Sequence, residues 1–181
     1  MLFIDTAKLA GRRNGFTLIE LLVVIAIIGI LSAVVLVSLN GARESARDAK
    51  RLSDVRQIQK ALDMYYIDND AYPTTSWVCS YHAHWQTGIV GAALSDYLAI
   101  LPRDPINDSS PSTNEDALSY CYYSIGHGMP ENGDWYMIVF GLEKENLAID
   151  EADGVSDCEG DPAFDYGGDG GHRITWGRSC S

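Results

Sequence analysis

One apolar stretch near the start of the chain constrains the fold more than any other feature. Residues 16–39 are apolar apart from one glycine and four polar side chains: Thr17, Glu20, Ser32 and Ser38. About 20 consecutive apolar residues are enough for a helix to cross a bilayer, so one transmembrane helix is predicted. Glu20 stands near its beginning, and a carboxylate inside hydrocarbon costs roughly 2.5–3.5 kcal/mol on insertion scales. Such an acid is expected to have a function and a partner.

Beyond this stretch the apolar pattern becomes that of a helix with one buried face. Apolar side chains recur every three or four residues: Leu52, Val55, Ile58, Leu62 and Tyr65 or Tyr66. No proline precedes Pro73, so one continuous helix is predicted from Phe16 to about Asp68. It should end in the turn-forming residues 68–73. The half of this helix that no head covers must lie in lipid or pack against copies of itself.

The remaining residues, 70–181, are enough for one small α+β head packed on the second half of the helix. A further helix is predicted over 89–101. Strands are predicted over 119–124 and 135–142, paired in a short antiparallel sheet. Two loops are predicted, over 105–116 and 147–171, the second without core strands because it is acidic and rich in glycine.

Residues 11–20 read GRRNGFTLIE and resemble the processing site of type IV prepilins and pseudopilins. In that family a short basic leader is cut between glycine and phenylalanine, and the new amine is methylated. The resemblance therefore implies cleavage between Gly15 and Phe16 and methylation of Phe16. It also implies that Glu20 pairs with a Phe16 amine during filament assembly. A secretory signal peptide is the alternative, but the apolar run is long for one and no small-x-small cleavage site follows it.

Three further patches resemble the major pseudopilin of type II secretion systems. They are residues 61–75, the sequence LPRDP at 101–105 with Asn107, and ITWG at 174–177. The resemblance implies a type IV pilin-like fold and a structural filament subunit. The alternative is a type IV pilin or minor pilin for adhesion, motility or DNA uptake.

The same resemblance implies an organisation, a location and a set of partners. Residues 1–15 would be a cytoplasmic leader, 16–39 the membrane and filament-core segment, 40–69 its amphipathic continuation, and 70–181 a head outside the cytoplasm. The chain would be a single-pass inner-membrane protein before assembly. Its expected partners are copies of itself, prepilin peptidase, a membrane assembly platform and minor pseudopilins.

Charge is unevenly distributed along the chain. The net charge is −12, yet residues 43–60 hold six of the 13 lysines and arginines. The basic stretch is interpreted as a solvated helix face, supported by the spacing of Glu44 with Arg47 and of Asp48 with Arg51. The acidic remainder disfavours nucleic-acid binding by the monomer.

Four cysteines, Cys79, Cys121, Cys158 and Cys180, all lie in the part expected outside the membrane. An even number suggests two disulfides, for which three connectivities exist. Cys158 with Cys180 is preferred, because closing a loop with little apolar content would stabilise it most. Cys79 would then pair with Cys121. The pseudopilins that this chain resembles generally lack such bridges, whereas many type IV pilins close a C-terminal loop in this way.

Two segments have side chains that metals use. Cys79, His82 and His84 are close in sequence, but zinc sites usually gather four ligands, so a surface loop is the preferred interpretation. Residues 150–169 contain eight carboxylates and no base, and calcium takes six to eight such oxygens. The resemblance implies a calcium site formed by Asp161, Asp165 and Asp169; the alternative is a solvated acidic loop.

Nothing in the sequence predicts an enzyme. No glycine-flanked nucleophile and no phosphate-binding loop is found. The sequence therefore predicts no catalytic residues.

Overall fold

The computed structural model describes residues 15–109, 117–125, 133–146, 155–156, 162–164 and 173–178. The chain divides into two compact units, residues 1–41 and 42–181. One helix, α1 (Leu18–Asn69), contributes residues to both. Its bounds confirm the predicted continuous helix to within two residues at either end.

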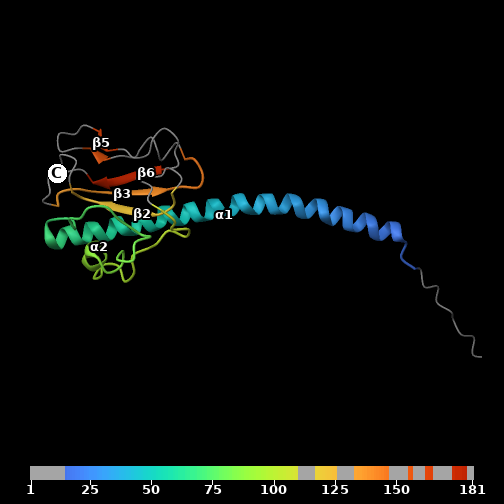
Figure 1. Ribbon diagram of the computed structural model, residues 1–181, viewed down its shortest axis with the longest axis horizontal. Coiled ribbons are helices and arrows are strands. Elements are labelled where there is room, and N and C mark those ends of the chain that lie inside the picture. Colours follow the sequence, from blue (N-terminus) through green and yellow to red (C-terminus); the bar gives the residue numbers. More distant parts are fainter. Residues whose placement is uncertain are drawn as a thin grey trace, which may run out of the picture. The chain divides into compact units, whose positions relative to one another are not determined.

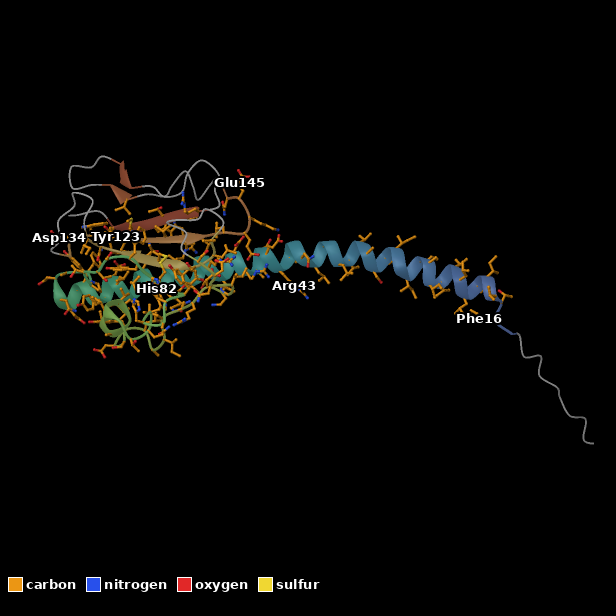
Figure 2. The ribbon with its side chains drawn as sticks, in the orientation of Figure 1. Phe16, Arg43, His82, Tyr123, Asp134 and Glu145 are labelled. Atoms are coloured by element: carbon orange, nitrogen blue, oxygen red, sulfur yellow. A yellow bond between two sulfur atoms is a disulfide. The ribbon has the colours of Figure 1, made fainter. Side chains whose placement is uncertain are left out.

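The first unit consists of the beginning of α1 and the three described residues before it. The helix is long and apolar enough to cross a membrane, and none of its most apolar 18-residue window is buried. Figure 2 shows the side chains of this part projecting from the helix on all sides.

The end of α1 is fixed by its own backbone. Asp70 has a φ of 53°, the left-handed conformation that commonly follows the last turn of a helix. Its N–H donates to the carbonyl of Tyr66 at 2.8 Å. The side-chain amide of Asn69 donates to the carbonyl of Tyr65 at 2.9 Å, so carbonyls of the last turn have partners.

The second unit contains a four-stranded antiparallel sheet in the order β1-β2-β3-β6. Its strands are β1 (Val78–Cys79), β2 (Tyr120–Tyr123), β3 (Tyr136–Gly141) and β6 (Arg173–Arg178). The strands predicted over 119–124 and 135–142 are confirmed as β2 and β3 with trimmed ends. The strands β1 and β6 were not predicted.

The C-terminal part of α1 covers one face of this sheet (Figure 1). Val55, Ile58 and Leu62 have no exposed surface and pack in one core cluster with alternate residues of the strands. This confirms the predicted buried stripe. The buried strand residues in the cluster are those that share the α1 face by the period of two along a strand: Val78, Tyr120, Tyr122, Tyr136, Ile138, Phe140 and Ile174.

A two-stranded ribbon, β4 (Val155–Ser156) and β5 (Pro162–Phe164), lies over the other face of the sheet. Val155 is only 3% exposed and packs with Met137 and Val139. The prediction that 147–171 lacks core strands is therefore wrong. Strands of two and three residues are too short to give an alternating pattern in the sequence. Val155 can pack against the sheet because residue 177 is a glycine: a Cβ at position 177 would lie 2.7 Å from Val155 Cγ2.

The helix predicted over 89–101 is also much shorter than expected. α2 runs only from Ile89 to Ala93 and is followed by turns. The side chain of Gln86 donates to the carbonyl of Leu101 at 2.5 Å and accepts from its N–H at 3.0 Å. Leu101 also precedes a proline, which disfavours helical backbone. The buried residues Val90 and Leu94 reach the core through a single turn instead of a long helix.

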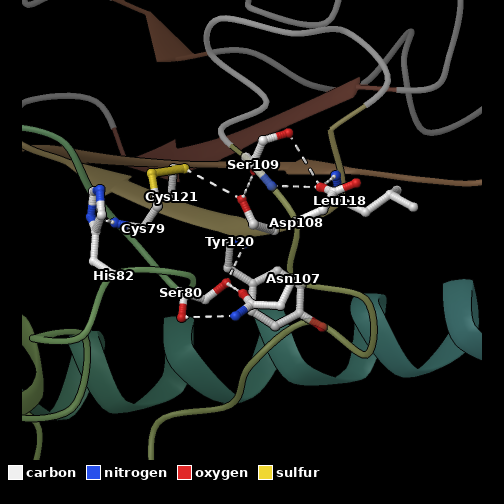
Figure 3. Close-up of a disulfide and its surroundings, with 10 residues drawn as sticks. Cys79, Ser80, His82, Asn107, Asp108, Ser109, Leu118, Tyr120 and Cys121 are labelled. Atoms are coloured by element: carbon white, nitrogen blue, oxygen red, sulfur yellow. Dashed lines mark hydrogen bonds between the residues drawn. A yellow bond between two sulfur atoms is a disulfide. The ribbon is translucent and has the colours of Figure 1, made fainter.

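A disulfide joins Cys79 to Cys121, which lie opposite each other on β1 and β2 (Figure 3). This is the second of the two expected pairs. Beside it, the Asn107 amide donates to the Ser80 carbonyl at 3.2 Å, so this part of the predicted loop 105–116 is tied to β1. Cys158 and Cys180 lie outside the described residues, and their pairing stays a prediction.

Candidate functional site

The predicted cleavage point precedes α1 in the first unit. Residues 15–17 are not helical, and the side chain of Phe16 is 80% exposed. No atom of the described chain lies within 4 Å of a Cβ built on Gly15. The described residues therefore leave the peptide bond between Gly15 and Phe16 accessible to another protein.

Glu20 takes part in a reciprocal capping interaction at the start of α1. Its Oε2 accepts from the backbone N–H of Thr17 at 2.9 Å and from the Thr17 hydroxyl at 2.7 Å. In return, the Glu20 N–H donates to Thr17 Oγ1 at 3.3 Å. This is a capping box, in which two side chains satisfy donors of the first helical turn. The sequence Thr17-x-x-Glu20 could have predicted it, but it was not recognised.

The helix after Glu20 has a continuous apolar surface that the described chain leaves open. The large apolar side chains that the structure describes between Leu18 and Leu39 are each at least 45% exposed, whereas monomeric soluble proteins rarely expose apolar patches above a few hundred Å². A surface of this extent requires cover by lipid or by other helices. The carboxylate of Glu20 lies at the beginning of this surface, four residues after Phe16, which is predicted to carry the new amine.

The second unit contains a buried ionic cluster centred on Arg51, whose side chain has no exposed surface. Arg51 Nε donates to Asp104 Oδ2 at 2.6 Å, and Nη1 donates to Asp48 Oδ1 at 2.7 Å and to Glu143 Oε1 at 2.6 Å. Arg47 Nε adds a hydrogen bond to Glu143 at 2.6 Å. We call these five residues the Arg51 cluster: Arg47, Asp48, Arg51, Asp104 and Glu143.

The Arg51 cluster joins three separate segments of the chain. Asp48 also accepts from the backbone N–H groups of Glu143 and Lys144 at 2.9 and 3.0 Å. Asp104 accepts from the N–H of Ile106 at 2.8 Å. The cluster thereby attaches α1 to the segment after β3 and to the turn that follows Leu101.

Electrostatics within the cluster favour the charged forms. Hydrogen bonds from Arg47, and then from Arg51, lower the pKa of Glu143 to about 2 although partial burial opposes this. Burial opposes the charge of Arg51, yet its hydrogen bonds to Asp104 and Glu143 raise its pKa. Arg51 and Glu143 are therefore both charged at neutral pH.

The interpretation of residues 43–60 as a solvated helix face is wrong for Arg51. Arg43, Lys50, Arg56 and Lys60 are exposed as expected, and the ion pair between Asp48 and Arg51 is present. The partners that bury Arg51, however, lie 53 and 92 residues further along the chain. Helix spacing alone cannot reveal partners at that separation.

The described residues contain no group of three or more His, Cys, Asp or Glu side chains placed to hold a metal. The sulfur of Cys79 is in the disulfide, and the Nδ1 of His82 accepts from the Cys79 N–H at 3.0 Å. The Cys79 sulfur and the His82 Nδ1 are therefore both occupied by partners within the protein. Asp161, Asp165 and Asp169 lie outside the described residues, so the structure does not test the expected calcium site.

Comparison with known families gives two matches. Residues 11–36 match the prokaryotic N-terminal methylation motif. Residues 38–133 match the family described as type II secretion system, protein G, and this match covers more than half of the chain.

Among curated proteins, the chain is similar to proteins named type II secretion system core protein G. The one from Aeromonas hydrophila is 50% identical over 64 residues, which are 35% of this chain and 45% of the relative. The one from Escherichia coli is 48% identical over 69 residues, 38% of this chain and 48% of the relative. The matched segment therefore spans about half the length of these relatives. No solved structure matches the chain.

Proposed function

The chain belongs to the type II secretion system protein G family, and from this we propose that it is the major pseudopilin of a type II protein secretion system. In this role it is a structural subunit that assembles into a filament through its N-terminal helix. The observation that carries the proposal is the exposed apolar surface of α1. It begins at the carboxylate of Glu20, which is the fifth residue after the accessible bond between Gly15 and Phe16.

Several findings support this function, and the first of them favours it over the alternative of a pilin for adhesion, motility or DNA uptake. The relatives reported above are named as secretion-system proteins, and the family match includes α1 beyond the apolar part together with the strands β1 and β2. The methylation motif covers the predicted processing site. A membrane-length helix without cover fits a subunit that is stored in lipid and later packed against its copies.

We further propose the order of events and the partners. The chain waits in the inner membrane with residues 42–181 outside the cytoplasm, and prepilin peptidase removes residues 1–15. A membrane assembly platform then adds the subunit to a filament that also contains minor pseudopilins. The carboxylate of Glu20 forms an ion pair with the positively charged amine of a Phe16 in the apolar filament core, so neither charge is left unpaired where water is absent.

Processing provides the direct test. We expect the intact mass of the native protein to correspond to a chain that begins at Phe16 and carries one additional methyl group. Gly15→Asp should block this cleavage, because a bulky acid next to the cleaved bond replaces the residue that the motif requires. Gly29→Ala, within the helix, is the matched control. Its product should still begin at Phe16 and carry the methyl group, and its mass should rise only by the one methylene that alanine adds to glycine. A native chain that begins at Met1 or at a residue after Val37 would contradict the proposal.

We also propose that the acid-rich segment binds calcium through Asp161, Asp165 and Asp169. Eight carboxylates without a base repel one another in a folded chain, and a divalent cation would relieve this repulsion. The described residues contain no group of three or more His, Cys, Asp or Glu side chains placed to hold a metal, so the acid-rich segment is the candidate. When bound, calcium would bring these oxygens together and order the segment.

We expect millimolar calcium to raise the melting temperature of the protein, because a ligand that binds only the folded state stabilises it by mass action. The increase should disappear in Asp165→Ala/Asp169→Ala and persist in the control Asp96→Ala, whose carboxylate lies outside the segment. Melting can be followed by tryptophan fluorescence with and without chelator. Identical curves in calcium and in chelator would show that the segment is only a solvated acidic surface.

A further inference from the structure

The disulfide between Cys79 and Cys121 is closed off from solvent within the second unit. The exposed fractions of the two cysteines are 1% and 0%. Disulfides form and exchange when a thiolate attacks a sulfur, so the rate depends on access to that sulfur. A thiol of another protein cannot reach sulfurs that are buried to this extent. The bond must therefore form while the second unit is still open.

Hydrogen bonds close the chain on both sides of this disulfide (Figure 3). The Cys79 N–H donates to Nδ1 of His82 at 3.0 Å. On the other side, Oγ of Ser119 lies 3.8 Å from the Cys121 sulfur and donates to the carbonyl of Ser109. The loop before β2 is thereby held against the start of that strand. These contacts belong to the folded state, so an enzyme that makes the bond has to act before they form.

The disulfide secures a strand that is too short to be stable by its own pairing. β1 has only two residues, which lie opposite Tyr122 and Cys121. The two cysteines are 42 residues apart, and among the described residues between them the one helix, α2, has five residues. A disulfide over a loop of such length shifts a folding equilibrium roughly 30-fold to several-hundred-fold.

Loss of β1 from the sheet would uncover β2. β1 is the edge strand in the order β1-β2-β3-β6, and β2 (Tyr120–Tyr123) is its neighbour. Without β1, backbone N–H and C=O groups of β2 would become unpaired, and an open strand edge is a template for aggregation. A chain without the disulfide is therefore expected to be removed by proteolysis or aggregation before it reaches a filament.

We propose that the thiols of Cys79 and Cys121 are the substrate of a dithiol oxidase outside the cytoplasm, which joins them before the second unit folds. This oxidation is then a maturation step that precedes filament assembly. The proposal rests on the proposed location of residues 42–181 outside the cytoplasm, because thiols are kept reduced inside it.

The oxidation is a pair of thiol–disulfide exchanges. The thiolate of one cysteine attacks the disulfide of the oxidase, which breaks that S–S bond, releases one oxidase sulfur as a thiolate and forms a mixed disulfide. The thiolate of the other cysteine then attacks the sulfur of the first. The bond between Cys79 and Cys121 forms, and the second oxidase sulfur leaves. Two electrons pass to the oxidase, and its two sulfurs take up the two protons that the cysteines lost.

Pulse-labelling of the full chain in cells tests the order of oxidation and folding. In a Cys158→Ser/Cys180→Ser chain only one pair can form; wild type, followed in parallel by peptide mapping, gives the same readout if that variant does not fold. Free thiols are alkylated at each time point, and folding is followed by limited proteolysis. We expect the disulfide to appear before protease resistance. Protease-resistant chains that still carry both thiols and are oxidised later would overturn the proposal.

A host that lacks the oxidase tests the need for the enzyme. We expect the amount of protease-resistant second unit to fall about tenfold or more, since the disulfide shifts folding by at least that factor. Adding Cys79→Ser/Cys121→Ser to the chain should cause the same loss in both hosts, because no pair is left to oxidise. Formation of the disulfide at an unchanged rate in the deficient host would overturn the proposal, as would full protease resistance of the variant without these cysteines.

Filament yield separates this proposal from those on which it rests. Sheared filaments should fall in parallel with the disulfide in the host that lacks the oxidase. Normal filaments built from chains with both thiols free would overturn the maturation step alone. Thiols that stay free at all times in the normal host would instead reject the placement outside the cytoplasm, and absence of filaments from oxidised wild-type chains would reject the filament function.

Discussion

Glu20→Gln is expected to abolish filaments, or nearly so, while membrane insertion and cleavage continue. Glutamine can still accept the hydrogen bonds from Thr17, because glutamate and glutamine both serve at this position of a capping box. The substitution therefore keeps the start of α1 and removes only the negative charge. Without that charge, the Phe16 amine would enter an apolar core unpaired, and breaking a buried pair typically costs 3–5 kcal/mol. Because every 1.4 kcal/mol changes an equilibrium about tenfold, assembly should fall by a factor of hundreds or more.

The measurement is the amount of sheared filament relative to total processed subunit. Glu145→Gln is the matched control, because it makes the same chemical change at an exposed residue of the second unit, and it should leave filament yield unchanged. Thr17→Ala separates capping from charge: it removes the hydroxyl partner of Glu20 but keeps the carboxylate, so a much smaller loss is expected. Normal filaments from Glu20→Gln would refute the charge-pairing argument.

Arg51→Met should destabilise the second unit by about 3–5 kcal/mol, the usual cost of removing one partner of a buried ion pair. Methionine can occupy the same space, but Asp48 and Asp104 would lose the cation that lies between them. For a unit of this size the loss corresponds to a drop in melting temperature of roughly 10–20 °C. Arg51→Lys should lie in between, since lysine restores the charge but lacks the fork that donates to Asp104 with two nitrogens.

Unfolding of the full chain in detergent, followed by tryptophan fluorescence, measures this loss because Trp85 and Trp135 are buried in the second unit. Arg103→Met is the control, since Arg103 is exposed and its substitution should change stability by no more than about 0.5 kcal/mol. Equal melting temperatures for Arg51→Met and Arg103→Met would show that the Arg51 cluster contributes no net stability.

The sequence predicted what depends on local pattern. The long apolar run, the absence of proline before Pro73 and the spacing of Val55, Ile58 and Leu62 were enough to predict α1 and its buried face. The aromatic and apolar residues of the segments that form β2 and β3 marked them as strands. The motif around Gly15 and Phe16 placed the candidate processing site, because peptidase recognition reads a short contiguous segment.

Only the tertiary structure decided the features that depend on distant segments. Arg51 has a helix spacing that suits a solvated face, and it is buried because Asp104 and Glu143 approach it from other parts of the fold. Val155 is buried because Gly177 leaves room for it on β6. The hydrogen bond from Arg178 to Asp63 joins the end of β6 to α1 across 115 residues of sequence. Local sequence fixes which residues can form a helix or a strand, whereas burial and charge pairing depend on which elements are brought together in space.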